Sequence, residues 1–389
     1  MKKIGILTLF YRNNNYGGCL QAYALNKFLR NHNFESVVLS YDYRSEEQCF
    51  CKSKIDKISQ YSLIEICKKV TNKIKYKVNF SKIKKHIEDN SAMFNDFVKK
   101  NINYTDITYY LDDIIDNNEK FDTFIVGSDQ VWNPNVATDA FFLKGVDEKV
   151  NRIAYAPSVS RSKLTQKETS VFLKNLHNFD YISVRESSAK ALLENATNKK
   201  ISIVLDPTFL LNKEEWKVLA GDRLVKEKYA LCYLFNNAPI YYKKIKEYCE
   251  KYELKMIIIP CASGIYNKKE YAYKDYHFGA PMGPKEFINL IANAEIVFTD
   301  SFHGVALSCN LNIDFMLFKR DKDSSKTSKN SRLEDILTLF NIKDRSVTID
   351  QIKDKKPIDF EVVNNIIEEN RNESIKFLLN ALNEESQND

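Results

Sequence analysis

Apolar and polar residues follow one another near the start of the chain as a strand, a turn, a helix and a second strand. Residues 4–10 form an apolar run with β-branched members, and residues 13–18 carry asparagine and glycine. Residues 20–29 have the apolar spacing of a helix, and residues 37–40 form another apolar run. This order predicts a β-α-β unit, and the apolar runs are typical of strands buried on both faces of a parallel sheet.

The strand–helix rhythm is interrupted once and later restarts. Lysine-rich sequence with helical periodicity follows at about residues 45–118, and strand-like runs return from residue 121 to residue 205. A second strand–helix series begins at residue 229. The predicted parts are an N-terminal α/β domain over residues 1–207 with a basic helical insert at about 45–118, a connection over 208–228, a C-terminal α/β domain over 229–355, and a C-terminal helix and tail over 356–389 that pack back on the first domain.

Two consecutive α/β domains predict a ligand cleft between the carboxyl ends of two sheets. The length of 389 residues accommodates two domains of ordinary size. The predicted fold class is therefore α/β, with two Rossmann-like domains, a central cleft and a helical insert in the first domain.

Composition limits the classes of protein that remain. No apolar run reaches the length of a membrane-spanning helix, and the start of the chain lacks the pattern of a signal peptide. The eight cysteines are scattered without CxxC pairs or histidine partners, which favours reduced thiols in the cytoplasm over a disulfide framework or a metal site. We therefore expect a cytoplasmic protein with no metal.

Positive charge is concentrated in one stretch of the chain. Between residues 52 and 100 there are 13 lysines and five acidic residues, which gives this stretch a net charge of +8. The whole chain has a net charge of +6, so the remainder is near neutral. Such a segment suits contact with an anionic membrane, and a solvated helical surface is the alternative. Nucleic acid is not an expected partner, because the stretch contains no arginine and matches no nucleic-acid-binding module.

Two segments at the ends of predicted strands carry glycine and polar groups. Gly17 and Gly18 lie between a strand and a helix, where exposed N–H groups can hold an anion or a sugar hydroxyl; a tight turn is the alternative. The second segment offers hydrogen-bonding groups and an aromatic face that suit a carbohydrate, or else forms a structural turn. Its chemical groups belong to Ser128, Asp129, Gln130, Trp132 and Asn133.

Two further segments favour an anionic ligand. Arg185 follows a strand and precedes a helix start, a setting that suits phosphate or carboxylate, with a surface pair to Glu186 as the alternative. His303 lies in the first turn of a helix that follows directly on a strand, where it is a catalytic candidate or a packing residue. Arg332 begins a later helix and is either a second anion contact or a solvated arginine.

Taken together, these segments resemble the polysaccharide pyruvyl transferase family. The matching pieces, in family order, are residues 4–8, 15–18, 20–25, 127–133, 183–186, 204–208 and 299–304. The resemblance implies a fold like that of the two-domain GT-B glycosyltransferases. It also implies transfer of pyruvate from phosphoenolpyruvate, the donor, to a sugar of a cell-surface polysaccharide or its lipid-linked precursor, with formation of a ketal.

The family resemblance also implies roles for individual residues. His303 would protonate the donor, and Asp129 or Asp300 would accept protons from the acceptor hydroxyls. The donor-binding set is Arg185, Ser301, Gly304 and Arg332, and the acceptor-binding set is Asn15, Tyr16, Gly17, Gly18, Gln21, Ser128, Gln130, Trp132 and Asn133. No cofactor is implied beyond the donor itself.

One position departs from the family pattern. Some members carry Arg-Leu-His where this chain has Ser301, Phe302 and His303. An anion contact is thus missing, and Arg332 or a lysine of residues 322–329 is the expected replacement. The alternatives to pyruvyl transfer are a GT-B glycosyltransferase that uses a nucleotide sugar and a non-catalytic protein that binds glycan or membrane.

Overall fold

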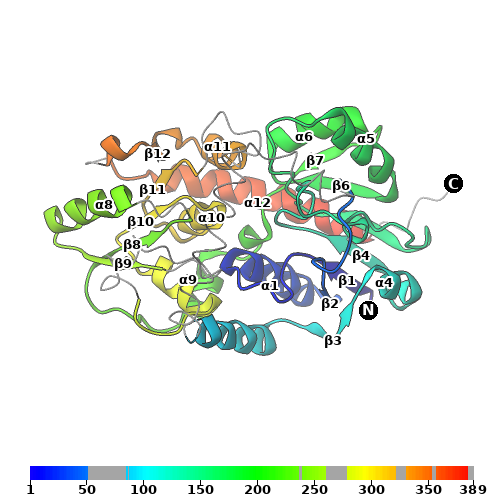
Figure 1. Ribbon diagram of the computed structural model, residues 1–389, viewed down its shortest axis with the longest axis horizontal. Helices are drawn as coiled ribbons and strands as arrows, with labels where there is room; N and C mark the ends of the chain where they lie inside the picture. The colour runs from blue at the N-terminus through cyan, green and yellow to red at the C-terminus, as the bar shows by residue number, and fades with distance from the viewer. Residues whose placement is uncertain are drawn as a thin grey trace.

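The computed structural model describes residues 1–50, 85, 87–235, 239–259, 278–320, 330–352 and 356–383, and it contains two parallel sheets (Figure 1). The first sheet has the strand order β3-β2-β1-β4-β5-β6-β7. Its strands are β1 (Lys3–Leu7), β2 (Glu35–Tyr41), β3 (Tyr104–Tyr109), β4 (Thr123–Val126), β5 (Asn151–Ala154), β6 (Tyr181–Val184) and β7 (Ile201–Ile203). The accompanying helices are α1 (Tyr16–Asn31), a helix over residues 87–101, α4 (Leu111–Asp116), α5 (Gln166–Asn175) and α6 (Ser187–Leu193).

The second sheet has the order β12-β11-β10-β8-β9. Its strands are β8 (Tyr229–Tyr233), β9 (Lys255–Ile258), β10 (Ile296–Thr299), β11 (Phe315–Phe318) and β12 (Ser346–Val347). The helices of this half are α7 (Lys213–Ala220), α8 (Pro239–Lys251), α9 (Pro284–Ala292), α10 (Phe302–Leu311) and α11 (Ser331–Leu339), and the chain returns through α12 (Phe360–Asn383).

The apolar strands reflect burial on both faces of the first sheet. Ile4 and Ile6 of β1 belong to one buried cluster, whereas Leu7 belongs to the cluster on the other face. Alternate residues of a strand point to opposite faces, so a strand covered on both sides must be apolar at consecutive positions.

One of these buried clusters continues from the first domain into the second. The ring of Tyr16 in α1 stacks on Phe287 of α9, with ring centroids 4.6 Å apart. Tyr16 also packs edge-on against Tyr233 of β8 and contacts Phe94 in the helix over residues 87–101. This shared core fixes the two sheets relative to each other.

Helix α12 runs back from the second domain along the first (Figure 1). Ser374 Oγ accepts the backbone N–H of Leu205 at 2.8 Å, and the side-chain amide of Asn151 donates to the carbonyl of Ala381. Arg371 joins α12 to the connection and to the second domain, because it donates to the carbonyl of Phe209 and to Asn310 Oδ1 in α10.

The expectation of a helical insert over residues 45–118 is wrong in its last part. Strand β3 pairs with β2 at the edge of the first sheet, and the short helix α4 follows it. The aromatic and β-branched residues of β3 favour a strand, but they adjoin a lysine-rich helical stretch that hides the change of period. Residues 51–84, which hold most of the lysines, lie outside the described residues. Within the described part of the chain, no helix is long and apolar enough to cross a membrane.

Candidate active site

Charged side chains from both domains meet at the carboxyl ends of the strands. Arg185 follows β6 and Asp206 follows β7, while His303 comes from the first turn of α10 after β10. All three side chains are buried. The carboxyl ends of parallel strands share one edge of a sheet, and the connections there build the ligand site of open α/β folds.

Arg185 is held by three carboxylates. Its Nη1 donates to Asp206 at 2.8 Å and its Nε to Glu186 at 3.0 Å, while Nη2 lies 3.6 Å from Asp129. The guanidinium also lies over the ring of Phe302, 4.0 Å from its centroid. The pair with Glu186 therefore exists, but it is buried within a network rather than exposed at the surface. A buried charge of this kind persists only with such partners.

Asp206 is the carboxylate that joins the two domains at the site. Its Oδ2 also accepts a hydrogen bond from Ser128 Oγ at 3.0 Å and lies 3.7 Å from His303 Nε2, and its Oδ1 accepts the N–H of Thr208. Burial alone would raise the pKa of Asp206. The interaction with His303, the charge of Arg185 and the Thr208 N–H outweigh burial and hold this pKa well below its usual range.

The low pKa of Asp206 decides its charge at the site. The group is ionised at neutral and mildly acidic pH. Its contribution to stability is present above the ordinary aspartate pKa of about 3.9, and it is lost only as the pH falls through the lower pKa of the folded state. His303 therefore always faces a carboxylate.

The imidazole of His303 packs against the first domain on its Nδ1 edge, and its Nε2 on the other edge can reach a ligand. A Cβ on Gly17 would lie 2.0 Å from Nδ1, so only glycine at this position of α1 allows the contact. The distance of 3.7 Å from Nε2 to Asp206 is too long for a hydrogen bond. Among the described residues, Nε2 has no hydrogen-bond partner. Nε2 is thus the atom with which this ring can reach a ligand.

Two more arginines come from the second domain. Arg320 follows β11 and donates from Nη2 to the carbonyl of Asp300 at 2.9 Å, while Phe235 covers its guanidinium. Arg332, in the first turn of α11, is buried and has no carboxylate within ion-pair distance among the described residues. Burial, followed by the positive charges of Arg320 and Arg185, lowers the pKa of Arg332 to about 9.

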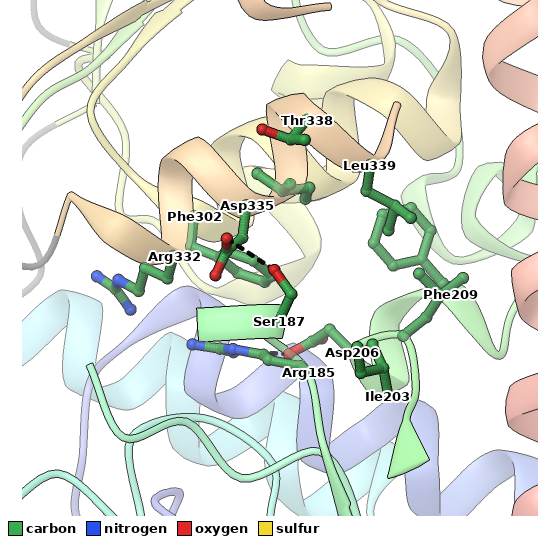
Figure 2. Close-up of a pocket in the computed structure, with 12 residues that line it drawn as sticks. Arg185, Ser187, Ile203, Asp206, Phe209, Phe302, Arg332, Asp335, Thr338 and Leu339 are labelled. Atoms are coloured by element: carbon green, nitrogen blue, oxygen red, sulfur yellow. Dashed lines mark hydrogen bonds and ion pairs between the residues drawn. The ribbon is translucent and has the colours of Figure 1, made fainter. Parts of the chain in front are cut away.

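Positively charged side chains from both domains thus gather at one place, and some of their donors have no partner in the described part of the chain. Figure 2 shows the guanidinium groups of Arg185 and Arg332 directed to the same side. Arg185 Nη2, Arg332 Nε and His303 Nε2 are buried and have no hydrogen-bond partner among the described residues. Each such donor costs about 1–3 kcal/mol when it is unsatisfied, which an anionic ligand would recover.

A carboxylate of the second domain fixes the position of Arg332. Asp335, also in α11, accepts hydrogen bonds from Ser187 Oγ at 3.0 Å and from the Ser188 N–H at 3.1 Å, at the start of α6 (Figure 2). This contact holds α11 against the first domain. Behind it lies a cavity of about 200 Å³ whose other wall includes the apolar side chains of Phe209 and Leu339.

The acceptor role predicted for Trp132 and its neighbours is wrong, because their side chains are buried. The indole of Trp132 is fully buried, stacks on Phe142 and donates to the carbonyl of Phe141. Ser128 is occupied by Asp206 and the carbonyl of Ala156. Asn133, also buried, closes the turn through Gln130 and the N–H of Asn135. Trp132, Ser128 and Asn133 therefore form the structural turn that was the alternative; Gln130 is partly exposed and stays a prediction.

The acceptor role predicted for the segment at the start of α1 is corrected for the same reason. Tyr16 is buried in the interdomain core, and Gln21 hydrogen-bonds to Thr8 and to the N–H of Ser128. The Gly18 N–H is taken by Asn15 Oδ1, which caps the helix. These groups are unavailable to an acceptor.

The residues around His303 position the site. The buried carboxylate of Asp300 accepts the N–H of Phe235 at 2.8 Å and faces Arg320, so we assign it a positioning role in place of the predicted proton transfer. A Cβ on Gly304 would lie 2.4 Å from Thr299 Oγ1, so glycine lets α10 begin against the end of β10. The side chain of Ser301 does not cap α10. Among the described residues, no cluster of histidine, cysteine and acidic side chains could hold a metal ion.

Sequence reasoning missed Asp206 and Arg320. Both follow directly on apolar strand-like runs, at residues 201–205 and 315–318. The rule that singled out Arg185, a polar residue at the end of a strand, would have found them.

Two parallel α/β sheets that meet at this charged site define a GT-B-type fold, and one solved structure with a TM-score of 0.50 agrees with it. The chain is similar to UDP-GlcNAc 2-epimerase from Neisseria meningitidis, bound to UDP-GlcNAc, at 12% identity over 98% of this chain and 100% of that one, with a TM-score of 0.50. It is also similar to UDP-N-acetylglucosamine 2-epimerase from Rickettsia bellii (9% identity, 98% and 96% of the two chains, TM-score 0.47) and to MurG from Acinetobacter baumannii (9%, 98% and 94%, 0.44). At these identities the likeness concerns the fold alone.

The family is defined by sequence. The model of the family described as polysaccharide pyruvyl transferase matches residues 15–322, which is most of the chain. The protein therefore belongs to the polysaccharide pyruvyl transferase family, and the resemblance noted from the sequence is confirmed. No curated protein matches it in sequence.

The poorly compensated charge of Arg332 predicts an unusual effect on stability. We expect Arg332→Met to leave the free energy of unfolding unchanged or to raise it, because replacing such buried charges by apolar groups is often neutral or stabilising. Inorganic phosphate should raise the melting temperature of the wild type and not that of this variant. Thermal and urea denaturation would measure both effects.

Arg345→Met is the matched control. Arg345 is equally buried but pairs with Asp314 at 2.9 Å, so its loss should destabilise the protein by about 3 kcal/mol. If Arg332→Met destabilised as much as Arg345→Met, or kept the shift caused by phosphate, the assignment of an anion site to Arg332 would be wrong.

Proposed function

We propose that the protein transfers a pyruvyl group from phosphoenolpyruvate to a sugar of a cell-surface polysaccharide or its lipid-linked precursor, with formation of a pyruvate ketal. The observation that carries this proposal is the set of three buried nitrogen donors, Arg185 Nη2, Arg332 Nε and His303 Nε2. Family membership supports pyruvyl transfer, and the geometry supplies groups for a donor with two anionic ends.

The arginines suit the two anionic groups of phosphoenolpyruvate. Its phosphate and carboxylate are both attached at C2 and leave the C3 methylene free. Arg185 comes from the first domain and Arg332 from the second, so a dianionic ligand can bridge them. Arg320, placed by Asp300 and Phe235, adds a third guanidinium. Arg320 and Arg332 together take over the contact that is missing at Ser301.

His303 is the proposed general acid. Its Nε2 lies 3.7 Å from the Asp206 carboxylate and has no hydrogen-bond partner among the described residues, so it is free to face a ligand. Transfer of the Nε2 proton to C3 converts the methylene to a methyl group and makes C2 oxocarbenium-like. One acceptor hydroxyl then adds to C2 and loses its proton.

The second half of the reaction exchanges phosphate for another oxygen. The C–O bond to phosphate breaks, inorganic phosphate leaves with the electron pair, and a second acceptor hydroxyl adds to C2. Of the two hydroxyl protons, one replaces the proton that His303 gave to C3 and the other leaves with phosphate or solvent. Asp129 is the proposed proton acceptor, because its buried carboxylate adjoins Arg185.

Histidine substitution tests the chemistry. We expect His303→Asn to lower turnover by about 10²–10⁴-fold, which is the usual contribution of general acid–base catalysis. The rise in melting temperature caused by phosphate should persist. Turnover is measured as phosphate release from phosphoenolpyruvate in the presence of mild-acid-treated surface polysaccharide from the source organism, with mass spectrometry of the product.

The control is His32→Asn, since the ring of His32 packs on Phe28 at the end of α1 and should not matter for turnover. Consumption of a nucleotide sugar with no pyruvyl mass on the polysaccharide would replace the proposal by glycosyl transfer. Polysaccharide binding with no turnover of either donor would indicate a non-catalytic binding protein.

We also propose that the reaction takes place on the cytoplasmic side, with peripheral contact at the inner face of the membrane. The lysine excess between residues 52 and 100 supports this, because each lysine near an anionic surface contributes about 1 kcal/mol. Flotation with liposomes should recover more protein when anionic lipid is present and less when salt is raised. Equal recovery from neutral and anionic liposomes would remove the membrane contact.

A further inference from the structure

A groove on the first domain has no part in the donor site. It lies between the loop that follows β1 and the helix over residues 87–101, and its volume is about 250 Å³. That is close to the lower end of about 300–1,000 Å³ found for small-molecule sites, so it suits one small unit rather than a macromolecule. Its walls include Tyr11, Arg12, Asn13, Asn95, Lys99 and Tyr104.

The groove and the arginine of the first domain lie toward opposite edges of the first sheet. In the first sheet, β1 lies toward one edge, with β2 and β3 beyond it, whereas β6 and β7 form the other edge. The loop that follows β1 leads directly into α1, and Gly17 of this helix contacts the imidazole of His303. The opposite edge of that ring faces Asp206, after β7. The groove is thus joined to the site through the start of α1 and lies apart from the anion position at Arg185.

The groove has the chemistry of a carbohydrate site. Tyr11 and Tyr104 are half-buried rings at its wall, and such rings present an apolar body with a polar tip. Asn13 and Asn95 bring amide groups that can exchange hydrogen bonds with hydroxyls. Trp132, the ring that the sequence favoured for this purpose, is buried away from any ligand.

The groove also carries positive charge. Arg12 and Lys99 are exposed, and the Arg12 guanidinium lies 5.0 Å from the centroid of the Tyr11 ring. Its pair with Asp42 at 3.3 Å is a surface contact of small worth, so the charge stays available to an acidic group on a sugar. The backbone of Arg12 has a φ of 49°, in the left-handed region where residues other than glycine are uncommon.

We infer that this groove holds a sugar ring of the acceptor chain, with the ring face against Tyr11. The inference rests on the proposed function, of which it specifies the acceptor side. It assigns Tyr11 a direct contact with the substrate.

The test uses a pair of substitutions at Tyr11. The tyrosine hydroxyl contacts Thr108 Oγ1 at 2.6 Å, so Tyr11→Ala removes both the ring and this hydrogen bond, while Tyr11→Phe removes only the hydrogen bond. The probes are the methyl glycosides of glucose, galactose, mannose and glucuronic acid, measured by saturation-transfer NMR on the full-length protein. At least one glycoside should bind the wild type and Tyr11→Phe alike, and bind Tyr11→Ala at least tenfold more weakly.

Three results would overturn the inference: no glycoside binds the wild type, Tyr11→Ala binds as the wild type does, or Tyr11→Phe loses as much as Tyr11→Ala. The last result would mean that Tyr11 acts only through Thr108. The phosphate-induced rise in melting temperature should be the same in all three proteins, which shows that the fold and the donor site are intact. Glycoside binding through Tyr11 without turnover of phosphoenolpyruvate would keep the groove and refute pyruvyl transfer.

Discussion

The ionic contact between Arg185 and Asp206 is the interaction on which the site depends. Both side chains are buried, and removal of either one would leave the other charge with weaker compensation. The same carboxylate oxygen of Asp206 that accepts from Arg185 also faces His303, so the contact sets the position of the donor arginine and the charge environment of the histidine together. Because Arg185 and Asp206 come from the first domain and His303 from the second, this geometry exists only while the domains are correctly placed.

Three features keep the domains in that placement. The stacking of Tyr16 on Phe287 makes the core continuous between them, and α12 returns to the first domain after crossing the second. The third is the contact of Asp335 with the start of α6. It lies on the same helix as Arg332, so it fixes the position of a charge that has no carboxylate within ion-pair distance among the described residues. Holding Arg332 there costs free energy of folding, and an anionic substrate would offset this cost. Such a trade-off between stability and function is common at binding sites.

The sequence was sufficient for most of the fold because buried parallel strands leave an unmistakable apolar pattern. It failed at β3, whose strand residues adjoin a lysine-rich helical stretch. For the site, position at the end of a strand was the useful signal, and it correctly brought Arg185 and His303 to one edge. The same signal exists for Asp206 and Arg320 and was not applied to them.

Other features of the site could not be predicted from sequence. Residue types in the segment containing Trp132 suited a carbohydrate, but burial of its side chain depends on Phe142 and other partners distant in sequence. The surroundings of Ser301 were equally hidden. Arg320 and Arg332, which we propose supply the contact missing there, are separated from Ser301 along the chain, and the packing of β11 and α11 against α10 positions them. The lysines of residues 322–329, the other expected replacement, lie outside the described residues.

A structure of the protein with phosphoenolpyruvate bound would test the central claim most directly. We expect the ligand to lie between Arg185 and Arg332, with its phosphate and carboxylate on guanidinium groups and its C3 methylene facing Nε2 of His303. Asp206 should keep its place beside Nε2. Binding outside this cluster, or a pose in which C3 points away from His303, would contradict the proposed site and its general acid.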